Sequence, residues 1–348
     1  MFLVIHHKEN VMRAVNVLIS LYPPKFLPTF PPYPDSCVHH IREKFPEVEV
    51  VAVKNKEEHC KKLPEAEVLF TWRPSDQDIR QAGRLQWVHV PSAGVDHSLP
   101  LELVESSTVL TNSSGLHGVP IAENVLGMMI ILARKLHDCM RFQMEGRWGR
   151  DDIMQDYPTL SELYGRTAGV VGLGSIGIEV AKRAKAFGMR VLATKRDMSV
   201  DIGLTEGWVD HLLPPEDLPK LLRESDFVVV ATPLTPTTRG LIGETELWMM
   251  KPTAFIFNIG RGPIIREAVL IRALKEGWIG GAGLDVFEVE PLPPTSELYL
   301  LPNVLVTPHY SGIGSGYWER ATDLFCGNLG RFLRGEGMTN VVKKKMGY

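Results

Sequence analysis

The stretch that decides the fold is GRTAGVVGLGSIGIEVAKRAKAFGMRVLATKR, residues 165–196. Its residues 168–173 form a short, Val-rich apolar run, which predicts a buried parallel strand. Residues 179–187 carry apolar side chains at helical spacing, and the glycine that follows ends the predicted helix. Residues 189–194 predict a second strand. The stretch therefore predicts a strand–helix–strand unit of an α/β sheet.

Three glycines lie between the first strand and the helix, in the pattern G-x-G-x-x-G. Gly172 permits a tight turn, Gly174 lets a pyrophosphate approach the backbone, and Gly177 lets the helix pack closely on the strand. The helix N-terminus then faces the anion. The same pattern occurs in glycine-rich turns of other α/β proteins, and its place between a strand and a helix is what favours a dinucleotide site here.

Length and composition limit the classes of protein to which this chain can belong. The 348 residues predict two domains or one large one, and the net charge of −3 argues against nucleic acid or an anionic membrane as a partner. The four cysteines are scattered without a C-x-x-C pair, so neither a disulfide framework nor a metal site is indicated. Residues 1–7 lack the pattern of a signal peptide, and the longest apolar run, 125–133, is too short to span a bilayer. We expect a cytoplasmic protein.

Strands and helices alternate on both sides of the central stretch, which is typical of parallel sheets. Strands are predicted at 2–5, 48–53, 68–71, 85–90, 109–112, 227–231, 254–258, 281–286 and 304–307. Helices are predicted at 11–21, from Asp35 or Ser36 to Phe45, and at 120–136, with an irregular link at 151–159. The helix over 120–136 is apolar on more than one face, so we expect it to be buried between domains or between subunits of a homodimer.

Residues 23–34 hold six prolines with aromatic residues between them. This composition favours an extended or polyproline conformation. The segment is either a ligand for an aromatic groove or, as we favour, a rigid surface loop.

Polar residues follow the predicted strands directly. In doubly wound sheets, ligands bind outside the carboxyl ends of the strands. The sequence therefore places its candidate site residues at 72–74, 91–96, 232–236, 259–262, 287–291 and 308–312.

These segments, with the glycine motif, closely resemble the D-isomer-specific 2-hydroxyacid dehydrogenases, especially the glyoxylate and hydroxypyruvate reductase branch. The matching motifs are SAGVD at 92–96, GVPIAE at 118–123, GLGSIG at 172–177, NIGRG at 258–262, LDVFEVEP at 284–291 and TPH at 307–309. The resemblance covers about residues 66–342. The Pro-rich segment looks like an insertion, and Lys343 stands where the family commonly has Asp.

The resemblance implies an α/β fold of two domains. A Rossmann dinucleotide-binding domain, residues 115–310, is expected to be inserted in a smaller, flavodoxin-like parallel-sheet substrate (catalytic) domain, residues 1–114 and 311–348. It also implies an enzyme that moves a hydride between NADP(H) or NAD(H) and a small 2-keto or 2-hydroxy acid. The alternative is a cofactor-sensing, corepressor-like binding protein of the same fold.

Three side chains are suited to the reduction of a 2-keto acid. Arg261 can hold the substrate carboxylate and polarise the substrate carbonyl with its planar guanidinium. The alternative is an arginine that lies on the surface or forms an ion pair. His309 can donate the proton, because an imidazole titrates near neutrality. Without the resemblance, a His after Thr-Pro would be a capping or packing residue. Glu290 would orient His309 and favour its charged form.

The resemblance assigns further residues. Asp285 would accept a hydrogen bond from the nicotinamide amide, or else simply support the site. Gly94 and Val95 would present N–H groups to the substrate carboxylate, and Trp72 and Arg73 would set the side-chain pocket. Trp148 and Trp318 either line that pocket or are core or interface aromatics. The full cofactor set is Gly172, Gly174, Ser175, Ile176, Gly177, Thr194, Lys195, Arg196, Thr232, Pro233, Ile259, Arg261, Asp285, His309 and Gly312.

The end of the second strand predicts a preference for NADPH. Lys195 stands where NAD-using relatives carry Asp, and Arg196 follows it. This pair attracts a 2′-phosphate, and Thr194 adds a hydroxyl. The alternatives are a solvated basic loop, or a turn that brings Asp197 to the ribose of NAD.

Overall fold

The computed structural model describes residues 14–23, 30–95, 97–155, 160–199 and 207–347. The chain forms two compact units: unit 1 comprises residues 1–114 and 316–348, and unit 2 comprises residues 115–315. Unit 2 is therefore inserted in unit 1 along the sequence. Among the described residues, no helix has both the length and the apolar character needed to cross a bilayer.

Unit 1 is built on a five-stranded parallel sheet in the order β2-β1-β3-β4-β5, which is the flavodoxin-like order. Its strands are β1 (Asn16–Ser20), β2 (Glu49–Ala52), β3 (Val68–Thr71), β4 (Trp87–Val90) and β5 (Val109–Asn112). Its helices are α1 (Asp35–Lys44), α2 (Lys56–Lys62), α3 (Asp76–Gln81), α4 (Leu101–Glu105) and α12 (Tyr317–Leu333), with 3₁₀ turns η1 (Leu63–Glu65) and η7 (Lys344–Met346). Every residue of β3 and β4 is buried, as expected for strands covered on both faces.

Unit 2 is built on a seven-stranded parallel sheet in the order β12-β11-β10-β9-β6-β7-β8, a Rossmann order with one further strand. Its strands are β6 (Thr167–Val171), β7 (Arg190–Thr194), β8 (His211–Leu213), β9 (Phe227–Val230), β10 (Phe255–Asn258), β11 (Gly281–Leu284) and β12 (Val304–Val306). Its helices are α5 (Gly118–Ala133), α6 (Leu136–Met144), α7 (Arg150–Gln155), α8 (Ser175–Ala186), α9 (Leu218–Glu224), α10 (Glu244–Met249) and α11 (Glu267–Lys275), with 3₁₀ turns η4 (Pro215–Asp217), η5 (Gly262–Ile264) and η6 (Glu297–Leu300).

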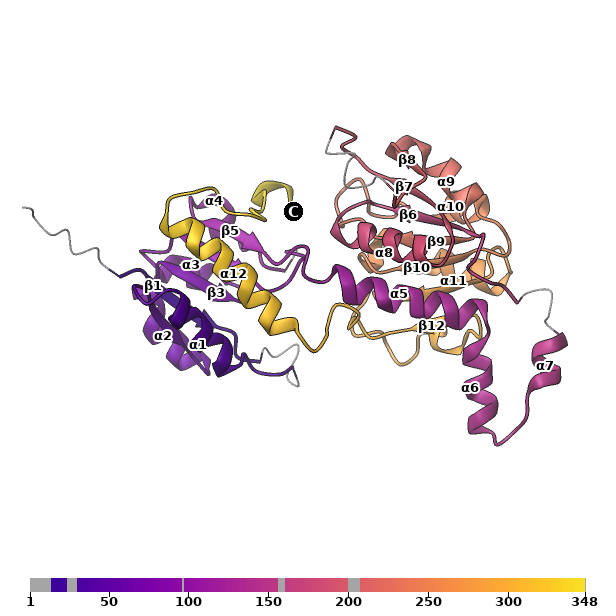
Figure 1. The fold of residues 1–348 in the computed structure, drawn as a ribbon, viewed down its shortest axis with the longest axis horizontal. Helices are drawn as coiled ribbons and strands as arrows, with labels where there is room; N and C mark the ends of the chain where they lie inside the picture. Colours follow the sequence, from indigo (N-terminus) through magenta and orange to yellow (C-terminus); the bar gives the residue numbers. More distant parts are fainter. Residues whose placement is uncertain (1–13, 24–29, 96, 156–159, 200–206, 348) are drawn as a thin grey trace, which may run out of the picture. The chain divides into compact units, whose positions relative to one another are not determined.

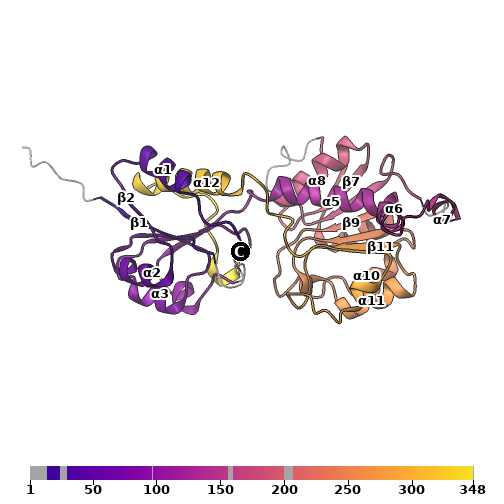
Figure 2. The ribbon, with the colours of Figure 1, turned by 90° about the horizontal axis from the view of Figure 1, so that it is seen from below.

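Helices cover both faces of the unit 2 sheet, as Figure 2 shows. Successive residues of a strand point to opposite faces, so Phe227 and Val229 pack under α5 and α8. Val228 and Val230 pack against α9, α10 and α11 on the other face. The α/β fold of two parallel sheets, predicted from the sequence, is confirmed.

Three predicted elements are corrected. The helix predicted at 11–21 is wrong, because residues 16–20 form strand β1 between β2 and β3; a short apolar run does not distinguish a strand from a buried helix. The helix predicted at 120–136 ends at Ala133, since Lys135 adopts the left-handed conformation (φ 53°) before α6 begins. The link predicted at 151–159 holds helix α7. Two further expectations, the strand at 2–5 and the start of the 11–21 helix, lie outside the described residues.

The second change of unit falls after Ser315, later than the predicted change after Tyr310. The physical reason is that Asp285 of unit 2 accepts hydrogen bonds from the backbone N–H groups of Tyr310 and Ser311. These bonds keep residues 310 and 311 with the unit 2 sheet.

The described end of the Pro-rich segment packs into unit 1 and is not a free surface loop. Phe30 is 8% exposed and meets the rings of Trp72, Tyr317 and Trp318 edge to face at 5.2–5.5 Å. The hydroxyl of Tyr33 lies 2.7 Å from that of Thr322 on α12. Trp318 is thus a core aromatic of unit 1, whereas Trp148 is 87% exposed.

Candidate active site

The register of the unit 2 sheet brings the ends of its strands into one row. Val171 of β6 pairs with Val230 of β9, which pairs with Asn258 of β10. Asn258 pairs with Leu284 of β11, and Leu284 with Val306 of β12. The candidate cofactor and catalytic residues that follow these strands therefore emerge at a single edge, as the sequence predicted.

The glycine loop between β6 and α8 has the shape of a phosphate cradle. Gly172 has φ 100°, and a Cβ there would lie 2.6 Å from the Thr232 side chain. A Cβ on Gly177 would lie 2.3 Å from the carbonyl oxygen of Gly172, so the helix approaches the strand too closely for any side chain. Nothing in the described chain lies within 4 Å of a Cβ on Gly174, which leaves space on the side where a pyrophosphate would approach.

Two polar features of this cradle fit a dinucleotide. Among the described residues, no side chain caps the N-terminus of α8, where Gly174 is the N-cap, so its N–H groups can face an anion. The hydroxyl of Thr232 is buried and has no hydrogen-bond partner in the described part of the chain. A buried hydroxyl without a partner is costly, and a bound ligand would satisfy it.

The end of β7 presents base and hydroxyl groups. Thr194 is 5% exposed, and its hydroxyl accepts the N–H of Gly172 at 3.2 Å, which ties this strand end to the glycine loop. Lys195 is half-buried and Arg196 is exposed. The Asp197 carboxylate instead accepts hydrogen bonds from the Ser199 hydroxyl (2.6 Å) and N–H (3.0 Å), so it is engaged within its own turn.

Arg261 lies in a loop between Gly260 and Gly262, and neither glycine has space for a side chain. A Cβ on Gly262 would lie 1.8 Å from the carbonyl carbon of Phe287, and a Cβ on Gly260 would lie 2.7 Å from the Thr232 carbonyl oxygen. Asn258 fixes the loop by donating to the Arg261 carbonyl (3.1 Å) and accepting from the Gly260 N–H (3.2 Å). The Arg261 guanidinium donates to the Gly260 carbonyl at 2.8 Å.

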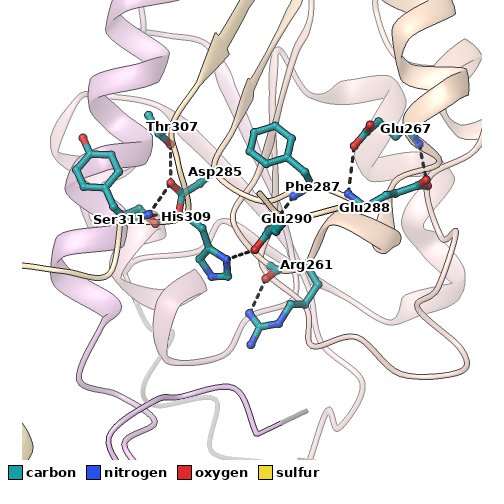
Figure 3. A network of polar contacts seen from close by, with 11 residues as sticks. Arg261, Glu267, Asp285, Phe287, Glu288, Glu290, Thr307, His309 and Ser311 are labelled. Atoms are coloured by element: carbon teal, nitrogen blue, oxygen red, sulfur yellow. Dashed lines mark hydrogen bonds and ion pairs between the residues drawn. The ribbon is translucent and has the colours of Figure 1, made fainter. Parts of the chain in front are cut away.

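His309 and Glu290 form a close pair, shown in Figure 3. His309 Nδ1 lies 2.7 Å from Glu290 Oε2, and Glu290 Oε1 accepts the N–H of Phe287 at 3.0 Å. Burial alone would raise the pKa of the Glu290 carboxyl, but the bond to His309, the charges of His309 and Arg261, and the Phe287 N–H together lower its pKa. The carboxylate is thus ionised at neutral pH, and it faces the imidazole of His309 directly.

The loop that carries Glu290 is held by a second pair of carboxylates. Glu267, at the start of α11, accepts the Glu288 N–H at 3.1 Å, and Glu288 accepts the Glu267 N–H at 3.1 Å. The sequence pattern indicated Glu288 only as part of a motif and gave no role to Glu267. The signal was available in the first-turn position of Glu267, which suits a helix N-terminus.

The remaining predicted cofactor residues lie along the same edge of unit 2. Ser175 and Ile176 begin α8, Pro233 follows Thr232 after β9, and the half-buried Arg261 follows Ile259, which is 5% exposed. Gly312 packs on the ring of His117, whose Nδ1 lies 3.2 Å from the Gly312 carbonyl oxygen.

The predicted substrate residues of unit 1 also follow adjacent strands, β3 and β4. Trp72 lies in the aromatic cluster with Phe30, and its carbonyl accepts the Ser98 hydroxyl at 3.2 Å, which links the two loops. The Asn112 amide donates to the Ala93 carbonyl at 2.6 Å and fixes the loop of Gly94. The side chain of Val95 is 2% exposed, so only its backbone can serve a ligand. Arg73 is exposed, and Asp96 lies outside the described residues.

The family model for the NAD-binding domain of D-isomer specific 2-hydroxyacid dehydrogenases matches residues 126–311. The chain belongs to this family. It is 36% identical over 322 residues to the glyoxylate reductase of Thermococcus gammatolerans, an alignment covering 90% of this chain and 94% of that protein.

Solved structures agree with this membership. A D-isomer specific 2-hydroxyacid dehydrogenase from Xanthobacter autotrophicus, solved with NADPH and MES, aligns with a TM-score of 0.80 and 29% identity, covering 96% of this chain and 100% of that one. The NADPH-dependent glyoxylate/hydroxypyruvate reductase of Sinorhizobium meliloti, solved with NADP and sulfate, aligns with a TM-score of 0.78 and 27% identity over the same shares.

This 2-hydroxyacid dehydrogenase is an NAD(P)-dependent oxidoreductase, as the sequence predicted. It interconverts a 2-keto acid and a 2-hydroxy acid by hydride transfer. The relatives named here are reductases and dehydrogenases, so the alternative of a corepressor-like binding protein is not favoured.

Proposed function

We propose that this dehydrogenase reduces glyoxylate, hydroxypyruvate or a similarly small 2-keto acid with NADPH in the cytoplasm. The observation that carries the proposal is the close pair of His309 and Glu290, with the charge of Arg261 acting on the same carboxylate. The names and bound cofactors of the relatives support the substrate class and the cofactor.

The side chains divide the work of the reduction. Arg261 binds the substrate carboxylate and carbonyl oxygen together, because its fork offers two parallel donors. His309, protonated and held by Glu290, gives its proton to the carbonyl oxygen as that oxygen gains charge. A reduced nicotinamide bound at the unit 2 site would supply the hydride to C2. One hydride and one proton then convert the keto group to the hydroxyl group.

Unit 2 is proposed as the dinucleotide-binding domain and unit 1 as the substrate domain. The cofactor set given above lies at the edge of the unit 2 sheet, and the uncapped α8 N-terminus with the unpartnered Thr232 hydroxyl supports that assignment. In unit 1 the backbone of Gly94 and Val95 would receive the substrate carboxylate. Trp72 and Arg73 would bound the pocket for the substrate side chain.

Replacing His309 or Arg261 by alanine tests the chemistry. Loss of a positioned general acid costs about 10²–10⁴-fold in rate, so we expect His309→Ala to lower kcat by that factor. Arg261→Ala should raise KM for the keto acid and lower kcat, since it removes binding and polarisation together. NADPH affinity, followed by its fluorescence, should fall much less than kcat in His309→Ala. Wild-type turnover by His309→Ala would refute the assignment.

The preference for NADPH rests on Lys195 and Arg196, supported by the engagement of Asp197 with Ser199. A carboxylate tied to its own turn is a poor acceptor for the ribose hydroxyls of NAD. We expect a higher kcat/KM with NADPH than with NADH, and a loss of that difference in Arg196→Ala or Lys195→Ala. An enzyme that uses NADH equally well would contradict the proposal.

We also propose a homodimer, formed through the α6–α7 arm (residues 136–155). The earlier expectation centred on the helix at 120–136, but α5 buries most of its apolar side chains within unit 2. Exposed apolar residues collect instead on the arm, which extends from unit 2 in Figure 1: Met140 (61%), Met144 (89%), Trp148 (87%) and Met154 (48%). Beneath the arm lies a hollow of about 980 Å³, whose lining is mostly charged and polar.

A further inference from the structure

Four aromatic rings from three distant parts of the chain form one cluster in unit 1. Trp72 is the first residue after β3, Tyr317 and Trp318 begin α12, and Phe30 belongs to the Pro-rich segment. The Phe30 ring meets the other three edge to face, at centroid distances of 5.2–5.5 Å. Phe30 is 8% exposed, whereas Trp72 is only half-buried. Phe30 is therefore a buried ring against which the more exposed Trp72 indole packs.

Helix α12 holds the Pro-rich segment in place beside this cluster. Trp318 Nε1 donates a hydrogen bond to the Pro31 carbonyl at 3.2 Å, and the Tyr33 hydroxyl lies 2.7 Å from the Thr322 hydroxyl. Three of the residues 31–34 are proline, whose rings fix φ and leave the backbone few other conformations. The aromatic ring that this segment brings to the cluster therefore has a fixed place.

The loop at 91–95, which would receive the substrate carboxylate, is held by bonds that removal of Phe30 leaves intact. The Asn112 amide (2.6 Å) and the Tyr317 hydroxyl (3.0 Å) each donate to a carbonyl of this loop, and neither bond uses the Phe30 ring. Removal of that ring should therefore loosen the Trp72 indole and leave the carboxylate site largely as it is.

We propose that Phe30 is a specificity-determining residue of this dehydrogenase. It holds the Trp72 indole in place, and the indole limits the size of the substrate side chain. The proposal rests on the proposed function, in which Trp72 bounds the side-chain pocket. The Pro-rich segment, which looks like an insertion relative to the family, thus acts on the choice of substrate within its own chain.

Phe30→Ala tests the proposal with two 2-keto acids of different size. Glyoxylate carries a hydrogen where phenylpyruvate carries a benzyl group. One methylene in a hydrophobic pocket is worth about 10–200-fold in discrimination, so we expect the ratio of kcat/KM for phenylpyruvate to kcat/KM for glyoxylate to rise about 10-fold or more. The value for glyoxylate should change little, because a hydrogen does not reach the wall of the pocket. An unchanged ratio, or an equal loss with both acids, would overturn the proposal.

Phe45→Ala is the matched control. Phe45 is 9% exposed, and it packs near the other end of α12, where a Cβ on Gly330 would lie 3.6 Å from its ring. Both alanine variants create a cavity in unit 1, so both should unfold at lower denaturant concentration than the wild type. Only Phe30→Ala should change the substrate ratio. An equal change in both would mean that loss of stability alters selectivity, and the proposal would fail.

Phe30→Leu decides the matter if Phe30→Ala does not fold. Leucine keeps an apolar side chain at this position, but it lacks the ring edge that meets Trp72. It should therefore raise the ratio in the same direction as alanine and by less. A raised ratio supports the proposal, and a wild-type ratio overturns it.

Trp72→Ala distinguishes failure of this proposal from failure of the proposed function. If Trp72→Ala raises the ratio and Phe30→Ala does not, the pocket assignment stands and the role of Phe30 is refuted. If Trp72→Ala leaves the ratio unchanged, Trp72 does not bound the pocket, and that part of the proposed function fails.

The double variant of Phe30→Ala and Trp72→Ala tests whether the two residues act together. Phe30 acts through Trp72 in the proposal, so its removal should add little once the indole is absent. Independent, additive changes in the ratio would contradict the proposal.

Discussion

At the scale of single residues, one carboxylate contacts the ring of His309, and a second binds the residues on either side of it in the chain. Glu290 meets the imidazole at 2.7 Å, and Asp285 binds the backbone and side chains on both sides of it. The sequence predicted the identity of His309, Glu290 and Arg261 as candidates. It did not predict the partners of Asp285, because Thr307 and Ser311 reach it only through the pairing of β11 with β12.

Glu290→Gln should change the pH dependence of reduction more than its maximum. The glutamine can still accept a hydrogen bond from the ring, but it withdraws the negative charge that favours a protonated imidazole. The histidine then gives up its proton at lower pH, so the falling limb of kcat/KM for the keto acid should move to lower pH. Profiles of both enzymes between about pH 5 and pH 8, the range in which an imidazole ordinarily changes charge, measure this shift. Coincident profiles would contradict the pairing.

At the scale of elements, chains of hydrogen-bonded side chains hold the loops that follow the strands. In unit 1, Ser20 at the end of β1 bonds to His59 Nδ1 of α2 at 2.8 Å, and His59 Nε2 lies 3.1 Å from Asp78 of α3. Asp78 also forms a capping box with Ser75, which follows the loop of Trp72 and Arg73. The strands could be predicted from apolar runs in the sequence, whereas these hydrogen bonds depend on which helices pack together.

Asp78→Asn should destabilise the protein in a pH-dependent way. Burial would raise the pKa of Asp78, but its bonds to His59 and Ser75 outweigh burial and lower its pKa. A carboxyl whose pKa is lowered by folding contributes stability above its unfolded pKa and loses it as the pH falls through the folded value. We expect Asn to cost about 1.5–3 kcal/mol at pH 7, the range for hydrogen bonds to charged groups. The difference should begin to shrink near the ordinary Asp pKa of about 3.9 and should close only at lower pH, below the lowered pKa of the folded state. Denaturant unfolding at pH 7 and across this acid range measures it.

At the scale of the whole molecule, the division into two units and their sheet orders followed from strand alternation and from the family motifs. The errors fell where local pattern is ambiguous, at β1 and at the α5–α6 junction. The outward-facing side chains of the α6–α7 arm could not be read from the sequence, because exposure depends on what the tertiary structure leaves uncovered.

The homodimer proposal predicts that polar residues on the arm dissociate the protein. Trp148→Glu with Met144→Glu places two charges in the proposed contact, where unpaired charge is costly. Light scattering at micromolar concentration should show twice the chain mass for the wild type and a smaller species for the double variant. Trp248→Glu, at an exposed tryptophan of α10 (59% exposed), is the matched control and should remain dimeric. A wild-type monomer would end the proposal.

Helix α12 covers one face of the unit 1 sheet, but it is synthesised only after the whole of unit 2. Phe325 of α12 is fully buried, and its ring stacks on Phe70 at 4.7 Å and on Trp87 at 5.0 Å. The ribosome adds about 5–20 residues per second, so the roughly 200 residues of unit 2 delay α12 by about 10–40 s after residue 114. During that interval the aromatic side chains of β3 and β4 lack α12, the helix that covers them in the folded protein. Unit 2 is continuous and can fold in that time, and unit 1 closes only after α12 has been made.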